Sequence, residues 1–76
     1  MKLSEILKIT RQKSFMTQED LASRLSVTPS TINRWEHGKA KPNMTAMKRL
    51  RTFCEEESIS FEEIENAWLI EKNSDE

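Results

Sequence analysis

Hydrophobic residues recur every three to four positions along most of the chain, which is the spacing of one face of an α-helix. Polar and turn-forming residues divide this pattern into five segments. The positions on the apolar faces are Leu3, Ile6, Leu7 and Thr10; Leu21, Ala22 and Leu25; Ile32 and Trp35; Met44, Met47, Leu50, Phe53 and Cys54; and Phe61, Ile64, Ala67 and Trp68. No segment alternates in the manner of a half-buried strand, so the pattern predicts an all-α fold of five helices.

Helix-capping residues set the expected bounds of the first, second and fourth helices. The first helix is expected over about residues 3–13, with Ser4 or a neighbour near its start. Thr17 followed by Asp20 is a variant of the capping box and predicts the start of the second helix. Asn43 is expected to cap the fourth helix.

The third helix has the clearest signals at both ends. Thr28 is a suitable N-cap, and Pro29 occupies the first helical position, where its missing N–H costs nothing. Gly38 is expected to end the helix in the left-handed conformation. A three-residue turn at 26–28 then joins two short helices, an arrangement that is typical of helix-turn-helix units reading the major groove of DNA.

The fifth segment completes a single domain. Ser60 and Glu63 predict a capping box for a helix over about residues 60–72. A chain of 76 residues holds one core at most, so we expect one domain over 1–72 followed by a polar tail at 73–76.

Charge is divided unevenly along the chain, although the formal net charge is only -1. Residues 1–54 contain eleven lysines and arginines and four acids, whereas residues 55–76 contain one lysine and nine acids. Such an asymmetry favours a basic part that meets a polyanion and an acidic part that stays away from it. The alternative interpretation is that two solvated faces simply differ in sign.

Several classes of protein are disfavoured by the residues present. Cys54 is the only cysteine, so an internal disulfide and a zinc site of paired cysteines are excluded, and no metal or cofactor is expected. There is no glycine-rich phosphate loop and no histidine beside a nucleophile, so we expect no enzymatic activity. No stretch approaches the length of a membrane span, and a cytoplasmic location is expected.

The central motif resembles a known family. Thr17-Gln18-Glu19-Asp20-Leu21-Ala22, the run from Val27 to Lys39 and the pair Lys41-Pro42 are similar to Cro/CI-type helix-turn-helix repressors, also called xenobiotic-response-element regulators. The resemblance extends from about Leu3 to Ile59. It implies a compact, lambda-repressor-like fold and a bacterial or phage-encoded regulator. Phe15 and Ser26 depart from the pattern, because many members have glycine at these positions.

The outer face of the third helix supplies the candidate base contacts. Ser30, Asn33, Arg34 and His37 share one helical face, opposite to Ile32 and Trp35. Arg34 is long enough to pair with guanine O6 and N7, and Asn33 suits adenine. Ser30 suits either base, and Pro29 can contact a thymine methyl. The resemblance implies the same reading positions, while a merely solvated polar face is the alternative.

Backbone contacts to DNA are expected on both sides of this helix, since phosphate contacts fix the register of such proteins. The start of the second helix offers an amide near a positive helix end, and a basic loop follows the third helix. The candidate phosphate contacts are Gln18, Thr28, His37, Lys39, Lys41 and Asn43.

Two further expectations concern structure and assembly. The resemblance implies that Glu36 pairs with Arg11 on the first helix, and we expect this pair to stabilise the fold. One short recognition helix reads few base pairs, so a homodimer on DNA is expected. The possible dimer interface consists of Phe61, Ile64, Trp68 and Leu69, for which closure of the monomer core is the alternative.

The sequence therefore predicts a sequence-specific transcriptional regulator that binds double-stranded DNA as a dimer, in the manner of a repressor. Two other functions stay open. One is an antitoxin, which binds DNA and also a toxin as its partner protein. The other is a helical adaptor that binds a protein and no DNA.

Overall fold

The computed structural model describes residues 1–71, and within this range the protein is entirely helical. The five helices are α1 (Leu3–Lys13), α2 (Gln18–Leu25), α3 (Pro29–Glu36), α4 (Met44–Glu56) and α5 (Glu62–Ile70). The predicted helix end near Lys72 and the tail at 73–76 lie outside the described residues. The all-α prediction with five helices is confirmed.

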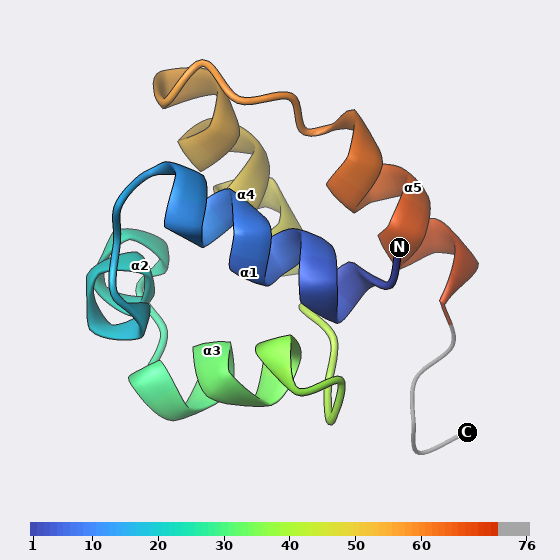
Figure 1. Cartoon of the computed structure of the whole chain (residues 1–76), viewed down its shortest axis with the longest axis horizontal. Helices are drawn as coiled ribbons and strands as arrows, with labels where there is room; N and C mark the ends of the chain where they lie inside the picture. The colour runs from blue at the N-terminus through green and yellow to red at the C-terminus, as the bar shows by residue number, and fades with distance from the viewer. Residues whose placement is uncertain (72–76) are drawn as a thin grey trace.

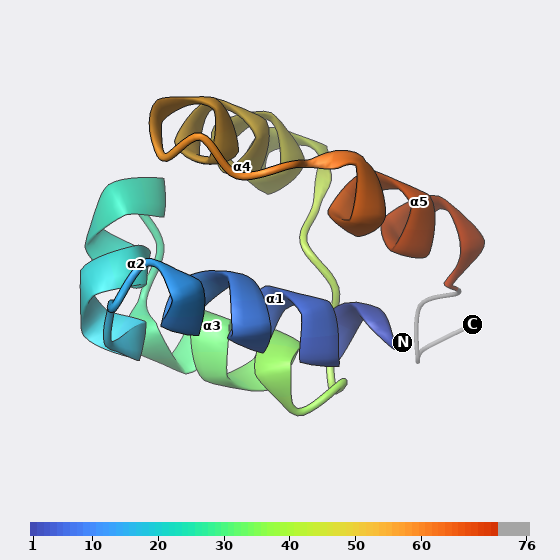
Figure 2. The same cartoon turned by 45° about the horizontal axis from the view of Figure 1, so that its top comes forward.

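The helices pack around α1, which crosses the centre of the molecule (Figure 1). α1 contacts both α3 and α5, whereas α2 contacts α3 and α4. α3 lies on one side of α1, and α4 and α5 lie on the other side in both views (Figure 2). The outer face of α3 is therefore separated from α5 by the thickness of the domain.

Three helix starts form as their capping residues predict. The Thr17 hydroxyl accepts from the Asp20 backbone N–H at 3.1 Å, and Asp20 accepts from the Thr17 N–H in return at 3.0 Å. These bonds hold the pKa of Asp20 below its usual value. Thr28 caps α3 with Pro29 in its first turn, and Asn43 caps α4.

The first four helices all end with a residue in the left-handed conformation, and only one of the four is glycine. These residues are Phe15 (φ 57°), Ser26 (φ 56°), Gly38 (φ 71°) and Ser58 (φ 57°). In each case the next residue donates its N–H to the carbonyl five positions back, which closes the helix end. After Phe15, Ser26 and Ser58 this next residue is apolar and packs against the core: Met16, Val27 and Ile59. The chain thus tolerates an unfavourable backbone conformation at three L-residues in order to bury the side chain that follows.

The core draws on all five helices. Its buried hydrophobic members are Leu3, Ile6, Leu7, Leu21, Ala22, Leu25, Ile32, Trp35, Ala46, Met47, Leu50, Phe53, Cys54 and Ile64. Thr10 is buried as well, and its hydroxyl donates to the Ile6 carbonyl at 2.8 Å. The apolar faces read from the sequence are largely confirmed.

Two expectations about the apolar faces and caps are wrong. Met44 is 63% exposed at the first position of α4. The capping box of Ser60 and Glu63 does not form, since α5 begins at Glu62 after Phe61. The Ser60 hydroxyl accepts instead from the Glu62 N–H at 3.4 Å. Ser60, which precedes the N-cap residue Phe61, thus supplies the partner for the first backbone N–H of α5.

Candidate nucleic-acid interface

The outer face of α3 is a continuous exposed surface. Pro29, Ser30, Asn33, Arg34 and His37 are all exposed, while Ile32 and Trp35 face the core. The Arg34 guanidinium forms no hydrogen bond or ion pair with any of residues 1–71. The structure thus brings the predicted base-contacting side chains together on one side of one helix, with the longest cation free of protein partners in the described part of the chain.

A hydrogen-bonded network lies directly behind this face. Arg11 on α1 donates twice to Glu36 on α3, from Nε to Oε2 at 2.7 Å and from Nη2 to Oε1 at 2.9 Å. The same guanidinium donates from Nη1 to the Met16 carbonyl at 2.8 Å. The side chains of Arg11 and Glu36 are 12% and 3% exposed. This pair therefore joins α1, α3 and the turn before α2 from inside the protein.

Gln18 extends the network toward the exposed face. Its Nε2 donates to Glu36 Oε1 at 3.0 Å, and its Oε1 accepts from Asn33 Nδ2 at 3.4 Å. Both Gln18 and Asn33 are thus in contact with protein partners, although both are candidate DNA contacts. The first helical residue of α2 is held against α3 by its side chain as well as by backbone packing.

Glu36 is ionised in the folded protein despite its burial. Burial alone raises the pKa of its carboxyl group, but the hydrogen bonds from Arg11 and Gln18 and the charge of Arg11 outweigh burial and lower the pKa overall. The hydrogen bond to Glu36 raises the pKa of Arg11 correspondingly. The acid that follows the reading face is therefore neutralised by its own partner and is not presented to a polyanion.

Beyond α3, the structure places the remaining phosphate candidates near the start of α4. His37 Nδ1 lies 2.8 Å from the Asn33 carbonyl, and His37, Lys39 and Asn43 are exposed. A hollow of about 290 Å³ opens here, lined by Val27, Thr31, Trp35, Lys41, Asn43, Thr45, Ala46 and Arg49. Sequence reasoning missed Thr31, Thr45 and Arg49 as neighbours of this site. Arg49 carries no local signal, because its position is set by a hydrogen bond from Nη1 to the Leu25 carbonyl on α2.

Lys41 lines this hollow, but its ammonium bonds to the end of α5. Its ammonium donates to the carbonyls of Trp68 at 3.0 Å and Glu71 at 2.6 Å, and it stands 4.8 Å from the centre of the Trp68 ring. The last carbonyls of a helix lack intrahelical partners, so the end of α5 attracts this cation. The ammonium of Lys41 is thus engaged by α5 in the free protein, and its contact with phosphate stays a prediction.

The four candidates for a dimer interface separate into two groups. Ile64 is fully buried in the core, so its assignment to an interface is wrong. Phe61 and Trp68 are partly buried against the core, and Trp68 Nε1 donates to the Pro42 carbonyl at 2.6 Å. Leu69 is 67% exposed. The structure thus gives α5 a role in closing the monomer and leaves only part of its apolar surface uncovered.

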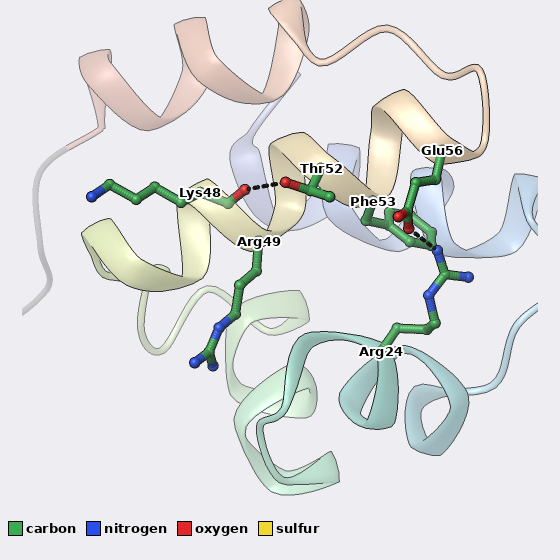
Figure 3. A pocket seen from close by; sticks show the side chains of 6 residues that line it. All are labelled: Arg24, Lys48, Arg49, Thr52, Phe53 and Glu56. Atoms are coloured by element: carbon green, nitrogen blue, oxygen red, sulfur yellow. Dashed lines mark hydrogen bonds and ion pairs between the residues drawn. The ribbon is translucent and has the colours of Figure 1, made fainter.

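A second hollow, of about 340 Å³, lies between α2 and α4 and is lined by Arg24, Lys48, Arg49, Thr52, Phe53 and Glu56 (Figure 3). Arg24 reaches Glu56 at 2.9 Å and Glu57 at 3.1 Å, and its guanidinium stands over the Phe53 ring. Lys48 and Arg49 point away from Arg24 (Figure 3). These contacts tie α2 to α4, and none of the lining residues pairs a nucleophile with a base.

Neither a metal cluster nor a membrane span is found among residues 1–71. No group of three or more histidine, cysteine or acidic side chains is arranged to hold a metal ion there. No helix in this range has the length and apolar character needed to cross a membrane.

Comparisons with known proteins agree with this geometry. The profile HTH_3, described as helix-turn-helix, matches residues 7–58. The chain is similar to the HTH-type transcriptional activator BcrR of Enterococcus faecalis, with 35% identity over 81 residues that cover 95% of this chain and 40% of BcrR. It is also similar to Multiprotein-bridging factor 1 of Debaryomyces hansenii, with 34% identity over 50 residues that cover 66% of this chain and 33% of that protein. No solved structure gives a significant match.

The chain thus spans less than half the length of both curated relatives. The profile match includes all of α2, the turn and α3, together with most of α1 and all of α4. A capped helix, a three-residue turn and a second capped helix with an exposed polar face occur together within the matched range. The protein therefore belongs to the helix-turn-helix family of the Cro/CI, or xenobiotic-response-element, type, a family of DNA-binding transcription regulators.

Proposed function

We propose that this chain binds double-stranded DNA in a sequence-specific manner by placing the start and outer face of α3 in the major groove. The observation that carries the proposal is the exposed row of Ser30, Asn33 and Arg34, in which Arg34 has no partner among the described residues. A free guanidinium beside polar groups on a short, rigidly supported helix has the length and donor pattern to read guanine.

The remaining side chains of this face have distinct roles in the proposal. Asn33 reads adenine with its amide, which Gln18 orients from behind through the 3.4 Å contact. Ser30 accepts or donates to a neighbouring base, and the Pro29 ring contacts a thymine methyl. All of these contacts come from the first turns of α3 and its outer surface, as expected for a recognition helix.

Phosphate contacts position α3 in the groove. We assign them to Gln18 and Thr28 at the helix starts, and to His37, Lys39 and Asn43 after α3. Thr45 and Arg49 join this group because they line the same hollow as Asn43. Such contacts add affinity that depends on salt but carry no sequence information.

Two copies are needed for a site of useful length. An α3 of eight residues contacts only a few base pairs, whereas a two-fold dimer reads two half-sites about 34 Å apart. We therefore propose that the chain acts on DNA as a homodimer. Its operator is then expected to be an approximate palindrome.

Repression is the proposed sign of regulation, because a domain bound over a promoter excludes polymerase. Activation is the second candidate, and the name of the relative BcrR favours it. A reporter gene under the selected operator distinguishes the two signs: expression falls on induction of a repressor and rises on induction of an activator.

Selection of bound sites from random duplex DNA tests the central proposal. Binding of the selected site should weaken steeply as salt increases. Arg34→Ala should lose about 5- to 150-fold in affinity and relax the preference at one base pair, as expected for one bidentate contact worth about 1–3 kcal/mol. Lys2→Ala removes the same charge outside α2 and α3 and is the control, with little change expected.

Two results contradict the proposal. The first is failure of the folded chain to enrich any sequence, which would favour the protein-binding adaptor. The second is an Arg34→Ala variant that weakens all sequences equally, because this is the behaviour of a phosphate contact. Lys39→Ala provides the comparison, since it is expected to weaken binding uniformly and to reduce the salt slope by about one.

A further inference from the structure

His37 follows the last residue of α3 and is the only histidine of the chain. Its side chain is exposed and lies about one helical turn beyond Asn33 on the outer face of the helix. Imidazole is the side chain whose charge ordinarily changes between pH 5 and pH 8. No other side chain assigned above to the DNA interface changes its charge in this range.

A hydrogen bond within the protein fixes the state of one ring nitrogen of His37. Nδ1 lies 2.8 Å from the Asn33 carbonyl oxygen, which also accepts from the His37 backbone N–H at 3.1 Å. A carbonyl oxygen has no proton to donate, so Nδ1 carries the proton of this bond. In the uncharged ring Nε2 is then an acceptor without a proton. Within residues 1–71, Nε2 forms no hydrogen bond.

This geometry determines how His37 can bind a phosphate. A phosphate oxygen of DNA is an acceptor too, so it does not bond to Nε2 of the uncharged ring. Moving the proton from Nδ1 to Nε2 would break the bond to the Asn33 carbonyl. Uptake of a second proton keeps that bond and adds a charge-assisted hydrogen bond from Nε2 to the phosphate. The charged ring therefore binds the phosphate at a lower structural cost.

The surroundings of His37 in the free protein offer little negative charge to a charged ring. Glu36, the neighbouring acid, is buried and paired with Arg11. Glu5 and Asp20 each accept from a backbone N–H at the start of a helix. A phosphate of bound DNA supplies a negative charge that the protein lacks at this place. The charged side chains of α3, of the two helices packed against it and of the loop that follows are Glu5, Lys8, Arg11, Lys13, Glu19, Asp20, Arg24, Arg34, Glu36, Lys39 and Lys41.

We infer that His37 binds a DNA phosphate as the imidazolium, so that DNA binding takes up a proton and becomes tighter as the pH falls. Nδ1–H stays on the Asn33 carbonyl, and Nε2–H donates to the phosphate oxygen. The DNA-bound state then holds more protons than the free state, and linkage favours such a state at low pH. The inference rests on the proposed function, in which His37 contacts a phosphate, and adds a dependence on proton concentration.

The affinity for the selected operator, measured from pH 8 to pH 5.5 at constant salt, tests the inference. The parent should gain about tenfold in affinity over this range, which corresponds to a bound state that favours the charged ring about tenfold. His37→Gln keeps a polar side chain that does not titrate, so its affinity should change little with pH. The range lies above 4.5, the ordinary pKa of Glu36, so the ion pair with Arg11 stays intact.

The salt dependence of binding is a second readout, and a merely structural role of His37 would not change it. A charged ring on a phosphate releases one further counterion. In the parent the slope of log affinity against log salt should therefore be steeper at pH 5.5 than at pH 8 by up to about 0.9. In His37→Gln the slope should be the same at both pH values. A ring that only stabilises the end of α3 would instead change the unfolding free energy with pH in the absence of DNA.

A relocated histidine is the matched control. Asn66 is exposed on α5, which the thickness of the domain separates from the outer face of α3. Asn66→His combined with His37→Gln keeps one imidazole in the chain but moves it away from the proposed interface. This double variant should bind the operator with as little pH dependence as His37→Gln alone.

Three outcomes overturn the inference: an affinity that does not change with pH in the parent, an equal change in His37→Gln, or equal salt slopes at pH 8 and pH 5.5 in the parent. Any of these results in a chain that selects DNA leaves the proposed function intact. A folded chain that selects no DNA at either pH contradicts the proposed function itself, and the inference with it.

Discussion

Arg11→Ala is the substitution from which the structure predicts the largest loss of stability at a polar site. It removes two hydrogen bonds to Glu36 and one to the Met16 carbonyl. The Glu36 side chain, only 3% exposed, then keeps a single partner in Gln18. Breaking one side of a buried ion pair costs about 3–5 kcal/mol because the remaining charge is left without compensation, and the Gln18 bond places the expectation at about 3 kcal/mol.

This loss is large relative to the stability of such a domain. A chain of 76 residues is expected to have about 4–11 kcal/mol of unfolding free energy. A loss of about 3 kcal/mol corresponds to a fall in Tm of about 12–24 °C for a domain of this size. Thermal and urea unfolding followed by circular dichroism measure both quantities.

The pH dependence of the difference in unfolding free energy between the parent and Arg11→Ala identifies Glu36 as the cause of the difference. In the parent the pKa of Glu36 is lowered by folding. The stabilisation that ionised Glu36 provides is therefore complete above its ordinary pKa of 4.5, and it is lost as the pH falls through the pKa of the folded protein. In Arg11→Ala the burial of Glu36 dominates, so the pKa of Glu36 is raised in the folded variant. As the pH falls and Glu36 takes up a proton, the variant therefore becomes more stable than it is at neutral pH. The stability gap between parent and variant should therefore narrow between pH 7 and pH 4.

A second variant tests the unpaired charge more directly. Arg11→Met combined with Glu36→Met replaces the ion pair by apolar side chains, and it should recover much of the lost stability. Equal unfolding midpoints for Arg11→Ala and the parent, or a gap that stays constant with pH, would refute the reasoning. So would a double variant less stable than Arg11→Ala.

Three other predictions concern the loops and the core. Phe15→Gly should raise the unfolding free energy by about 0.5–1 kcal/mol, since Phe15 is 96% exposed at a φ of 57°; a lower Tm in calorimetry would show that the ring makes a stabilising contact. Cys54 should react with a thiol reagent only after unfolding, because burial raises its pKa to about 11; rapid modification of native protein contradicts this. Lys41→Met should increase amide exchange at the end of α5 and leave the salt slope of DNA binding unchanged, whereas a reduced slope would restore Lys41 as a phosphate contact.

Capping chemistry explains why most helix bounds were predicted correctly. Thr17 with Asp20, Thr28 with Pro29, and Asn43 act on backbone groups within three residues, so a short window of sequence contains the whole interaction. The exposed polar face of α3 was predicted for a similar reason. A periodicity of 3.6 residues fixes which side chains point outward once the helix bounds are known.

The contacts that the sequence did not predict share a different cause, namely partners that are distant in sequence. Lys41 is held by carbonyls 27 and 30 residues away, and an unsatisfied helix end has no composition that marks it in advance. Ile64 was assigned to a surface because its own segment does not record which helices pack against α5; it is buried, and α5 contacts α1. The left-handed ends at Ser26 and Ser58 gave no signal of their own, since glycine is the residue that usually marks them.

Lys41 links the loop after α3 to the last turn of α5. The same lysine lies between α3 and α4 and donates to two carbonyls at the end of α5. A ligand that changed the Lys41 contacts on binding α3 would therefore also change the stability of the end of α5. Because such coupling is reciprocal, loosening the end of α5 would change the affinity of α3 for that ligand by the same factor.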